Sequence, residues 1–215
     1  MLDFHDIEQN NDEWLDMRIA KLTGSGFSKI MANYGKAFGE PAKDYATNIA
    51  IEIITGLRSE GGYTNEHMQR GHDQEPLALA RYEEEMFCET LNGGFFSSDF
   101  IGVSPDFRTI DNGLGEIKSV IRSVHYKNVN RNSYDPAYKW QVIGNMHYTK
   151  SDYIDFVSYC ADYPHEKQVF IYRLKPEMVK EEIKQLEDRV DQFKKLVKER
   201  IEVIKNAQYI NLEGK

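Results

Sequence analysis

Residues 102–118 read GVSPDFRTIDNGLGEIK, and the prediction of the fold starts from this stretch. Residues 100–104 have the apolar character of a short strand, and residues 114–120 have the character of a second one. Between them stands Asn112-Gly113, and this dipeptide is typical of a type I′ hairpin turn because both residues tolerate a positive φ. The stretch therefore predicts a β-hairpin with a polar turn.

The predicted hairpin brings together the residues that carry chemistry. Side chains alternate between the two faces of a strand, so Glu116 and Lys118 share one face and Ile117 points into the core. The turn folds Asp106 back beside Glu116, and adjacent carboxylates repel each other unless a cation lies between them. Carboxylate oxygens suit Mg²⁺ or Mn²⁺, and a nearby lysine can orient or deprotonate a water. The pattern indicates a metal-dependent nuclease; the alternative is a solvated hairpin with a surface Glu–Lys pair.

Helical patterns precede the hairpin. The first covers residues 11–18, with Asn11 or Asp12 at its N-cap, and it ends at the turn of residues 23–26, where Ser25 can cap a second helix. The next two are a helix with an apolar face over residues 46–54 and a C-cap at Gly56, and a helix over residues 64–89.

Strands and helices alternate after the hairpin. The patterns predict a helix near residues 137–146, strands over 153–160 and 168–174, and a long helix over about 176–205. Apolar residues of the last helix alternate spacings of four and three, which predicts a seam that packs on the domain or on a partner chain. Helices followed by a mostly antiparallel sheet with an inserted helix define an α+β architecture.

The composition excludes several classes of protein. The chain has 215 residues and a net charge of −8, which excludes a globally basic surface for nucleic acid but leaves room for a local basic groove. Its two cysteines, Cys88 and Cys160, cannot form a disulfide framework, a four-cysteine zinc site or a four-cysteine iron–sulfur cluster. No apolar run approaches the roughly 18 residues of a membrane span, and the acidic N-terminus is unlike a secretory signal, so we expect a cytoplasmic protein.

Positive charge is concentrated in residues 118–150, where six Lys or Arg residues stand against the single acidic residue Asp135. Five aromatic residues are interleaved with them, namely Tyr126, Tyr134, Tyr138, Trp140 and Tyr148. A basic and aromatic strip beside a metal site suits a phosphate backbone. A polar loop with aromatic residues in the core is an equally good interpretation.

Two further groups of residues are candidates for the site. Glu75, on the fourth predicted helix, can supply a third carboxylate, although it can also be one of many exposed acidic residues. Arg18, Thr23 and Ser25 combine a guanidinium, two hydroxyls and the free N–H groups of a helix start, which can hold a terminal phosphate. Taken without other information, a plain helix cap is the simpler interpretation of these three.

In their order along the chain, these segments resemble the lambda exonuclease family, the YqaJ-type viral recombinases of the PD-(D/E)xK nuclease superfamily. The resemblance covers about residues 8–175 and depends on DEWLDMRIAKLTGSGFSKI, RGHDQE, SPD with GEIK, and YKWQVIGNM followed by FVSYCADYP. It implies a restriction-endonuclease-like α+β core, with a central mixed or antiparallel sheet flanked by helices. It also implies a single exonuclease domain over residues 1–215, with a C-terminal helical appendage at about 176–205.

The resemblance assigns a metal site to the hairpin. Asp106, Glu116 and the backbone carbonyl of Ile117 would bind Mg²⁺, with Mn²⁺ as a possible substitute. Glu75 would be the helix carboxylate near a second ion, so that each active site would hold two ions. Lys118 would be the catalytic lysine that acts on the attacking water.

The resemblance also assigns a pocket for the end of the DNA. Arg18, with Thr23 and Ser25, would hold the 5′-phosphate of the strand being degraded. Gln141 matches the first glutamine of a paired-glutamine helix, and Ile143 stands where the second would be. The sequence therefore does not supply the polar contact that is expected from the second glutamine.

Members of the family are ring-shaped homotrimers that degrade the 5′-ended strand of duplex DNA and act with a phage single-strand annealing protein. The resemblance therefore implies a phage- or prophage-encoded, Mg²⁺-dependent 5′→3′ exonuclease in the host cytoplasm, which leaves a 3′ overhang. Two alternatives stay open. One is a PD-(D/E)xK endonuclease or a single-strand-directed nuclease, and the other is a non-catalytic module that binds DNA ends or an annealing protein.

Overall fold

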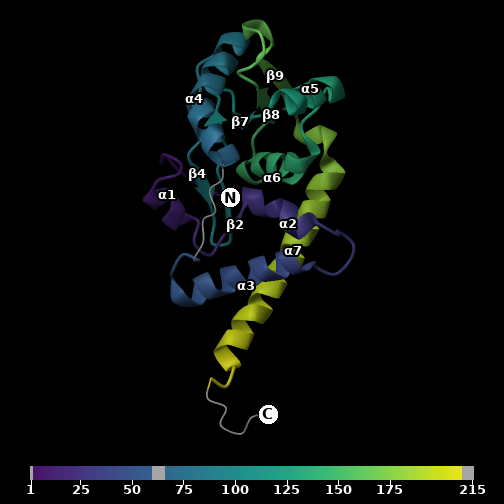
Figure 1. Ribbon diagram of the computed structural model, residues 1–215. Coiled ribbons are helices and arrows are strands. Elements are labelled where there is room, and N and C mark those ends of the chain that lie inside the picture. Colours follow the sequence, from purple (N-terminus) through teal and green to yellow (C-terminus); the bar gives the residue numbers. More distant parts are fainter. Residues whose placement is uncertain (1, 60–65, 210–215) are drawn as a thin grey trace.

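A five-stranded sheet in the order β3-β6-β7-β8-β9 lies at the centre of the fold (Figure 1). The structure is a computed structural model that describes residues 2–59 and 66–209, with all their side chains except those of 66–69 and 72. The strands are Leu91–Asn92, Phe107–Arg108, Gly113–Ser119, Tyr153–Tyr159 and Val169–Leu174. β7 and β8 run parallel, and the other neighbouring pairs are antiparallel. The mixed α+β fold predicted from the sequence is confirmed.

A second sheet in the order β1-β4-β5-β2 connects the N-terminal part of the chain to the hairpin region. Its strands are Asp3–His5, Phe95–Ser97, Ile101–Val103 and Leu22–Thr23. Thr23 of β2 pairs in parallel register with Gly102 of β5. Because Asp106 follows shortly after β5, this pairing fixes the turn after Thr23 relative to the segment that carries Asp106.

Helices cover both faces of the five-stranded sheet. They are α1 (Asp12–Met17), α2 (Phe27–Met31), α3 (Glu40–Thr55), α4 (Glu66–Met86), α5 (Arg122–Arg131), α6 (Lys139–Thr149) and α7 (Lys180–Asn206). Short 3₁₀ turns stand at Gly24–Gly26, Pro136–Tyr138, His165–Lys167 and Pro176–Met178. α4 lies on one side of the sheet, while α5 and α6 lie on the other and form the long crossover that a parallel β7–β8 pair requires (Figure 1).

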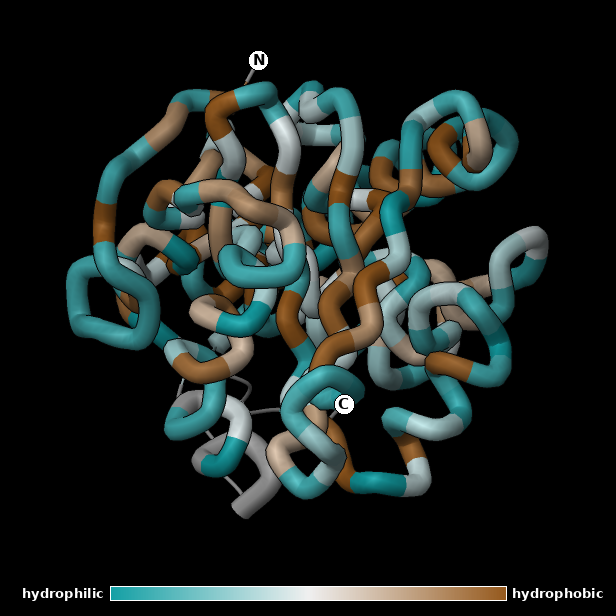
Figure 2. The backbone as a smooth tube through the Cα atoms, turned by 90° about the horizontal axis from the view of Figure 1, so that it is seen from above, coloured by the Kyte–Doolittle hydropathy of each residue, from teal (hydrophilic) through white to brown (hydrophobic). Residues whose placement is uncertain are grey.

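The apolar residues form two clusters, one on each face of this sheet. The larger cluster joins the β7–β8 face to α2, α3, α6 and α7, with Phe27, Phe156 and Phe193 completely buried. The smaller cluster packs α4 against the opposite face, where the rings of Tyr82 and Phe107 lie 4.4 Å apart. Figure 2 shows the hydrophobic segments gathered in the interior and the hydrophilic ones in the outer loops. Burial of apolar surface on both faces is what holds β7 between two layers.

Several helix ends agree with the sequence. The Asn11 side chain caps α1 by accepting a hydrogen bond from the Trp14 N–H at 2.8 Å. Gly56 ends α3 with a left-handed φ of 67°. α6, β8, β9 and α7 lie where the patterns predict them. The predicted start of the fourth helix, at Thr64, lies outside the described residues.

Four details of the sequence analysis are wrong. The predicted hairpin is wrong in its first strand and in its turn. β7 pairs with β6 at Phe107–Arg108, whereas the strand at Ile101–Val103 belongs to the other sheet. The hairpin is closed by a longer loop and not by a type I′ turn, because Gly113 already belongs to β7 and the Thr109 hydroxyl accepts its N–H at 2.9 Å. Ser25 does not cap α2, since Gly26 holds that position without a side-chain bond. Ile53 and Ile54 are 42% exposed and therefore lie off the buried face of α3.

The fourth error is that α5 was not predicted at all. The side chains that this helix buries include His125 and Asn128, and both bond the Ser158 hydroxyl of β8, at 3.0 and 3.1 Å. A helix that docks through polar side chains lacks the apolar period by which amphipathic helices are recognised.

The seam of α7 packs on this chain's own domain. Leu186, Val190, Phe193 and Val197 are buried in the larger cluster. Arg189 on the same helix is only 2% exposed and donates to the backbone carbonyls of Ile30 at 2.7 Å and Lys36 at 3.1 Å. Its guanidinium also lies over the ring of Phe38, at 3.7 Å. Within the described ranges, no helix is both long and apolar enough to cross a lipid bilayer.

We expect Arg189→Met to lower the free energy of unfolding by about 2–4 kcal/mol, because the buried carbonyl of Ile30 and the partly buried carbonyl bond at Lys36 lose their donor. Each buried group that is left unsatisfied costs about 1–3 kcal/mol. Urea denaturation of the purified protein measures this loss. Lys198→Met, an exposed position on the same helix, serves as the control. If both variants unfold at the same urea concentration, Arg189 does not fasten α7 to the α2 region.

Candidate active site

The hairpin places Asp106 against the backbone of β7. The Asp106 Oδ2 atom accepts the Ile117 N–H at 2.5 Å, and the Asp106 N–H donates to the Gly115 carbonyl at 2.9 Å. Ile117 itself points into the smaller apolar cluster, as predicted. Asp106 therefore stands beside the strand position that separates Glu116 from Lys118.

Glu116 is completely buried and surrounded by donors. The Lys118 Nζ lies 2.6 Å from Glu116 Oε1, and the Gln141 Nε2 donates to the same oxygen at 2.6 Å. The Asn145 Nδ2 donates to the other oxygen, Oε2, at 3.0 Å. Both amides come from α6, and a buried carboxylate can remain ionised only with such compensation.

Glu75 reaches the same region from α4. It lines a cavity of about 570 Å³ together with Asp106, Ile117 and Lys118, and a second cavity of about 390 Å³ also touches Glu75 and Asp106. Four of the predicted residues are thus brought to one cavity. Arg70 lines it as well, and its buried Nε has no hydrogen-bond partner among the described residues.

The buried carboxylate of Asp155 connects α4 to the sheet. Tyr82 stands two helical turns after Glu75 and donates its hydroxyl to Asp155 Oδ2 at 2.7 Å. Arg173 binds the same carboxylate through two nitrogens, at 2.8 and 2.7 Å. Because Asp155 belongs to β8 and Arg173 to β9, the position of Glu75 depends on these strands.

Two carboxyl groups of the site have raised pKa values, because their surroundings disfavour the ionised form. Burial first, and then the charge of Asp106, raise the pKa of Glu75 to about 7. Burial likewise raises the pKa of Glu116 to about 7, although Lys118 opposes the shift and Asp106 adds to it. Burial lowers the pKa of Lys118, but Glu116 and Asp106 outweigh that effect and raise it above its ordinary value. The site is therefore short of positive charge, and Lys118 remains an ammonium ion.

This donor set fits a hard divalent cation. Three carboxylates and a backbone carbonyl could provide oxygen ligands, and a cation would offset the burial and the repulsion that raise both pKa values. Among the residues that the structure describes, no three His, Cys, Asp or Glu side chains form a ready-made metal cluster. The oxygens of Glu116 instead face Lys118 and the two amides of α6.

The predicted phosphate residues lie around a tyrosine. The Tyr45 hydroxyl of α3 accepts the Thr23 N–H at 3.0 Å and lies 3.2 Å from the Thr23 hydroxyl, which is 3.4 Å from the Ser25 hydroxyl. The Arg18 guanidinium stacks over the Trp14 ring at 4.1 Å, and burial lowers its pKa while Tyr45 opposes the shift. Arg18, Thr23 and Ser25 do not line either of the two cavities described above.

Residues 118–150 can be interpreted from their sequence either as a strip that suits a phosphate backbone or as a polar loop with aromatic residues in the core, and both interpretations apply in part. Four of its aromatic residues pack against the larger core cluster, namely Tyr134, Tyr138, Trp140 and Tyr148. Tyr126 is 62% exposed on α5. Tyr138 also lines the cavity, and the Lys118 Nζ lies 4.8 Å from its ring centre. Most of these aromatic residues are therefore core residues, and Tyr138 is the one that meets both the core and the cavity.

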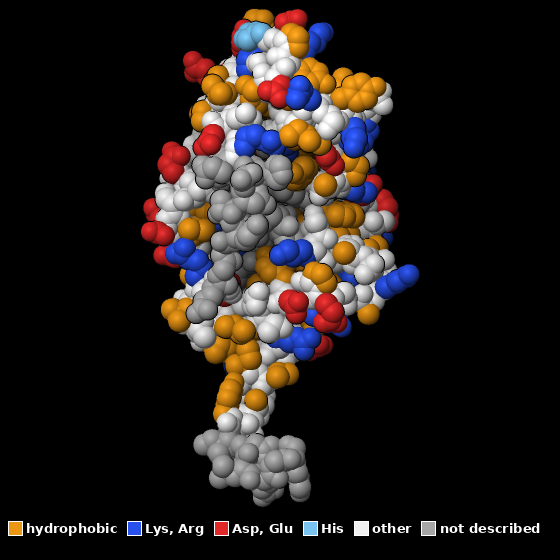
Figure 3. Space-filling model, in the orientation of Figure 1, with side chains coloured by type: hydrophobic (Ala, Val, Ile, Leu, Met, Phe, Trp, Pro, Cys, Tyr) orange, Lys and Arg blue, Asp and Glu red, His pale blue; other side chains and the backbone are white. Residues whose placement is uncertain are grey.

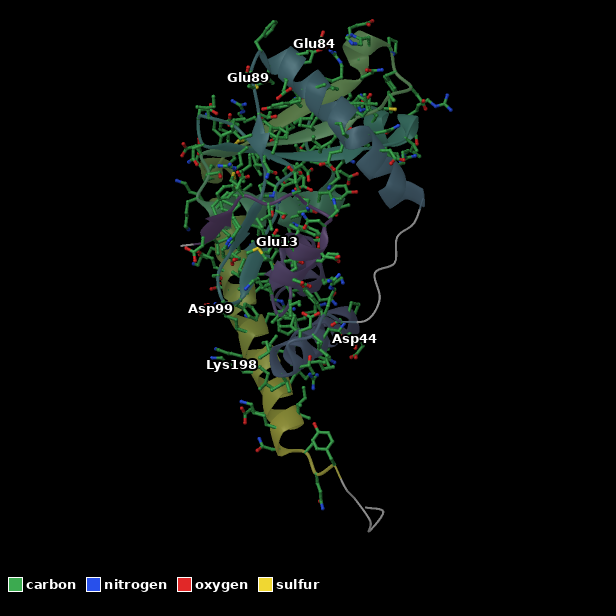
Figure 4. All side chains as sticks on the ribbon, turned by 90° about the vertical axis from the view of Figure 1, so that its left-hand side faces the viewer. Glu13, Asp44, Glu84, Glu89, Asp99 and Lys198 are labelled. Carbon is green, nitrogen blue, oxygen red and sulfur yellow. The ribbon has the colours of Figure 1, made fainter. Side chains whose placement is uncertain are left out.

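Several acidic side chains lie on the outer surface. Glu13, Asp44, Glu84, Glu89 and Asp99 are exposed and come from separate parts of the surface (Figure 4). On the face drawn in Figure 3, Lys and Arg side chains are mixed with acidic and apolar ones. The cavities are lined by acidic residues as well, with Arg70 and Lys118 as the basic residues of their lining, so the excess negative charge is shared between the site and the outer surface.

The sequence analysis missed two residues of this region. Asn145 stands four residues after Gln141, so both amides share one face of α6, whereas Ile143 is completely buried in the core. The missing second amide is therefore supplied from Asn145 and not from position 143. The helical spacing of Gln141 and Asn145 was the available signal. Tyr45 had no such signal, because only the fold brings α3 to Thr23.

Comparisons with known proteins agree with this geometry. A family model described as the YqaJ-like viral recombinase domain matches residues 13–152. An alkaline exonuclease from Laribacter hongkongensis, LHK-Exo, is 27% identical with a TM-score of 0.76, and the match covers 91% of this chain and 96% of that one. LHK-Exo in complex with dAMP is 28% identical over the same shares of the two chains, with a TM-score of 0.77.

A phage-related exonuclease from Haemophilus somnus 129PT shares the fold, with a TM-score of 0.62 at 16% identity over 86% of this chain and 96% of that one. A search of curated proteins finds no match. The family match includes Glu75, Asp106, Glu116 and Lys118, and it extends over well more than half of the chain. The chain therefore belongs to the YqaJ-like viral recombinase family, the lambda exonuclease family predicted from its sequence, and it has the PD-(D/E)xK fold of the alkaline exonucleases.

Proposed function

We propose that this chain is a Mg²⁺-dependent 5′→3′ exonuclease that hydrolyses the 5′-ended strand of double-stranded DNA and leaves a 3′ overhang. The observation that carries the proposal is the convergence of Glu75, Asp106, Ile117 and Lys118 on one cavity. Family membership and the similarity to an alkaline exonuclease support the same chemistry. A structure of that relative contains dAMP, which is the kind of product that an exonuclease releases from DNA.

Asp106, Glu116 and the carbonyl of Ile117 would hold one divalent ion, Mg²⁺ or in its place Mn²⁺, and Glu75 would stand near a second. When bound, the ions would supply Lewis-acid polarisation of the phosphate and activation of a water. The protein's own contribution is to fix these oxygens in a partly buried site, where electrostatic interactions are stronger than in water.

Lys118 would act on the water and on the charge of the reacting phosphate. Its ammonium group lies between Glu116 and the cavity and is held by the charges of Glu116 and Asp106. A lysine in this place can orient the attacking water, accept its proton once a nearby cation has lowered the lysine pKa, or stabilise negative charge in the transition state. Arg70, with its unpartnered Nε, is suited to a phosphate oxygen of the bound strand.

Arg18, Thr23 and Ser25 would bind the terminal 5′-phosphate. Arg18 ends α1, Thr23 belongs to β2, and Ser25 lies in the turn that follows. The pairing of β2 with β5 places Thr23 and this turn near the segment that carries Asp106. An arginine that is stacked on Trp14 is held in one orientation, and hydroxyl groups complete the set of donors.

We expect Arg18→Ala to slow the digestion of 5′-phosphorylated blunt duplex by about 10- to 100-fold, since a hydrogen bond to a charged group contributes about 1.5–3 kcal/mol. The same variant should digest 5′-hydroxyl duplex as slowly as the unaltered protein does. Initial rates on the two substrates measure both effects. Equal rates of the unaltered protein on 5′-phosphate and 5′-hydroxyl ends would remove the assignment of this pocket.

A time course on end-labelled linear duplex, with and without Mg²⁺, tests the proposed function. A 5′ label should be released early as mononucleotide and a 3′ label should persist in single strands. Cleavage of a covalently closed plasmid would favour an endonuclease instead. Binding of DNA ends without any metal-dependent turnover would favour a non-catalytic module.

The proposed enzyme comprises residues 1–215 as one domain and acts in the host cytoplasm with a single-strand annealing protein. It would form a ring-shaped homotrimer, in which closure around DNA replaces a globally basic surface as the source of processivity. The net charge of −8 and the exposed acidic residues are consistent with such a ring, because its outer surface need not attract DNA. Light scattering during size-exclusion chromatography measures the number of subunits.

A further inference from the structure

The amide of Asn145 holds the most deeply buried carboxylate of the site. Asn145 and Glu116 are both completely buried, and the Asn145 Nδ2 lies 3.0 Å from Glu116 Oε2. Gln141, one helical turn earlier, donates to Oε1 at 2.6 Å. Each oxygen of Glu116 thus has its own amide from α6, and this pair of bonds fixes the rotation of the carboxylate plane.

The fold alone does not account for an asparagine at this position. The Asn145 Oδ1 atom is buried and has no hydrogen-bond partner among the residues that the structure describes. A buried acceptor without a donor costs about 1–3 kcal/mol, and an apolar side chain of the same size avoids that cost. The hydrogen bond that its NH₂ group donates to Glu116 therefore explains why an amide stands at this position.

Gly24, in the turn at residues 23–26, leaves space for this amide. A Cβ atom built on Gly24 would lie 2.6 Å from Asn145 Oδ1 and 3.8 Å from the Cγ of Gln141. The turn therefore packs directly on both amide-bearing side chains, with no room for a larger residue at position 24. A side chain at position 24 would displace Oδ1, so the glycine leaves space for the amide to direct its NH₂ group at Glu116.

We infer that Asn145 is a positioning residue, which orients Glu116 for the divalent cation and replaces the amide that Ile143 does not supply. Asn145 acts through Glu116 and has no contact with the substrate of its own. The inference rests on the proposed metal-dependent function. Residues that orient a metal ligand typically change metal affinity by about 10- to 100-fold when they are removed.

The test is a titration of the full-length protein with Mn²⁺, in which electron paramagnetic resonance measures the free ion. Asn145→Leu keeps the size of the side chain and removes the donor, and we expect it to weaken Mn²⁺ binding by about 10- to 100-fold. Ile143→Val is the matched control, because it shortens a completely buried residue of the same helix whose side chain belongs to the larger apolar cluster. Its Mn²⁺ affinity should equal that of the unaltered protein.

Gly24→Ala is the second variant and remains informative if Asn145→Leu does not fold. It leaves every side chain of the site in place but pushes on Asn145 Oδ1, and it should also weaken Mn²⁺ binding. If the unaltered protein binds Mn²⁺ and both folded variants bind it equally well, the inference is overturned while the proposed function stands. If the unaltered protein binds no Mn²⁺, the proposed metal dependence fails and the inference fails with it.

Discussion

Lys118→Ala should reduce the hydrolysis of duplex DNA by about 10²- to 10⁴-fold, the range typical of a lost group in proton transfer. The affinity for the same DNA should remain close to that of the unaltered protein. Rates at saturating Mg²⁺ measure the first quantity, and fluorescence anisotropy with a labelled duplex measures the second.

The physical reason lies in the charges around Lys118. Its Nζ is the cation nearest to Glu116, at 2.6 Å, and the charges of Glu116 and Asp106 keep it protonated. Its loss removes both a group that can move a proton and the positive charge beside the reacting phosphate. The change leaves Arg70 in the cavity and the proposed phosphate residue Arg18 in place, which is why binding should persist.

The matched control is Lys198→Ala, which removes the same charge from an exposed position of α7, far from the cavity (Figure 4). It should hydrolyse DNA at the rate of the unaltered protein. Lys118→Arg separates the two roles of the lysine, since it keeps the charge but cannot exchange a proton near neutral pH. Substantial turnover by Lys118→Ala would rule out the mechanism proposed for this residue.

Local patterns were sufficient for much of the fold. The period of α7, the Asn11 cap of α1 and the strands β7, β8 and β9 all follow from residues that are close in sequence. The parallel pairing of β7 and β8 depends on the crossover between them. Because α5 docks through His125 and Asn128 and not through an apolar stripe, its presence was not visible in the sequence.

The same distinction applies to the candidate site. Asp106, Glu116 and Lys118 lie on one hairpin, so their proximity could be predicted from strand alternation. Glu75 approaches from α4, and its placement depends on the bond between Tyr82 and Asp155, two residues that no short motif connects. Contacts between distant segments of the chain decide that part of the site, and a resemblance to a family substitutes for them only where the motifs match.

Glu116→Gln should abolish metal-dependent hydrolysis and should also remove most of the stabilisation that Mg²⁺ gives to the fold. A neutral amide cannot compensate a divalent cation, and a ligand that binds only the folded state raises its stability through its binding free energy. Thermal unfolding with and without Mg²⁺ measures the second effect. Glu89→Gln removes an exposed carboxylate that lines neither of the two cavities described above, and it is the control.

The stability of the metal-free protein should depend on pH in a way that reveals the buried Glu116. In the fold, burial and neighbouring charges raise the pKa of Glu75 and Glu116 from 4.5 to about 7. Between these values the folded state holds more protons than the unfolded chain, so the free energy of unfolding falls as the pH rises from about 4.5 to about 7 and levels off above. Mg²⁺ should flatten this decline because it compensates the ionised pair. In Glu116→Gln one of the two groups no longer titrates, so the decline should become shallower without Mg²⁺ as well. A metal-free protein that instead gains stability over this range would show that the carboxylates are already compensated, and the argument for a cation between them would fail.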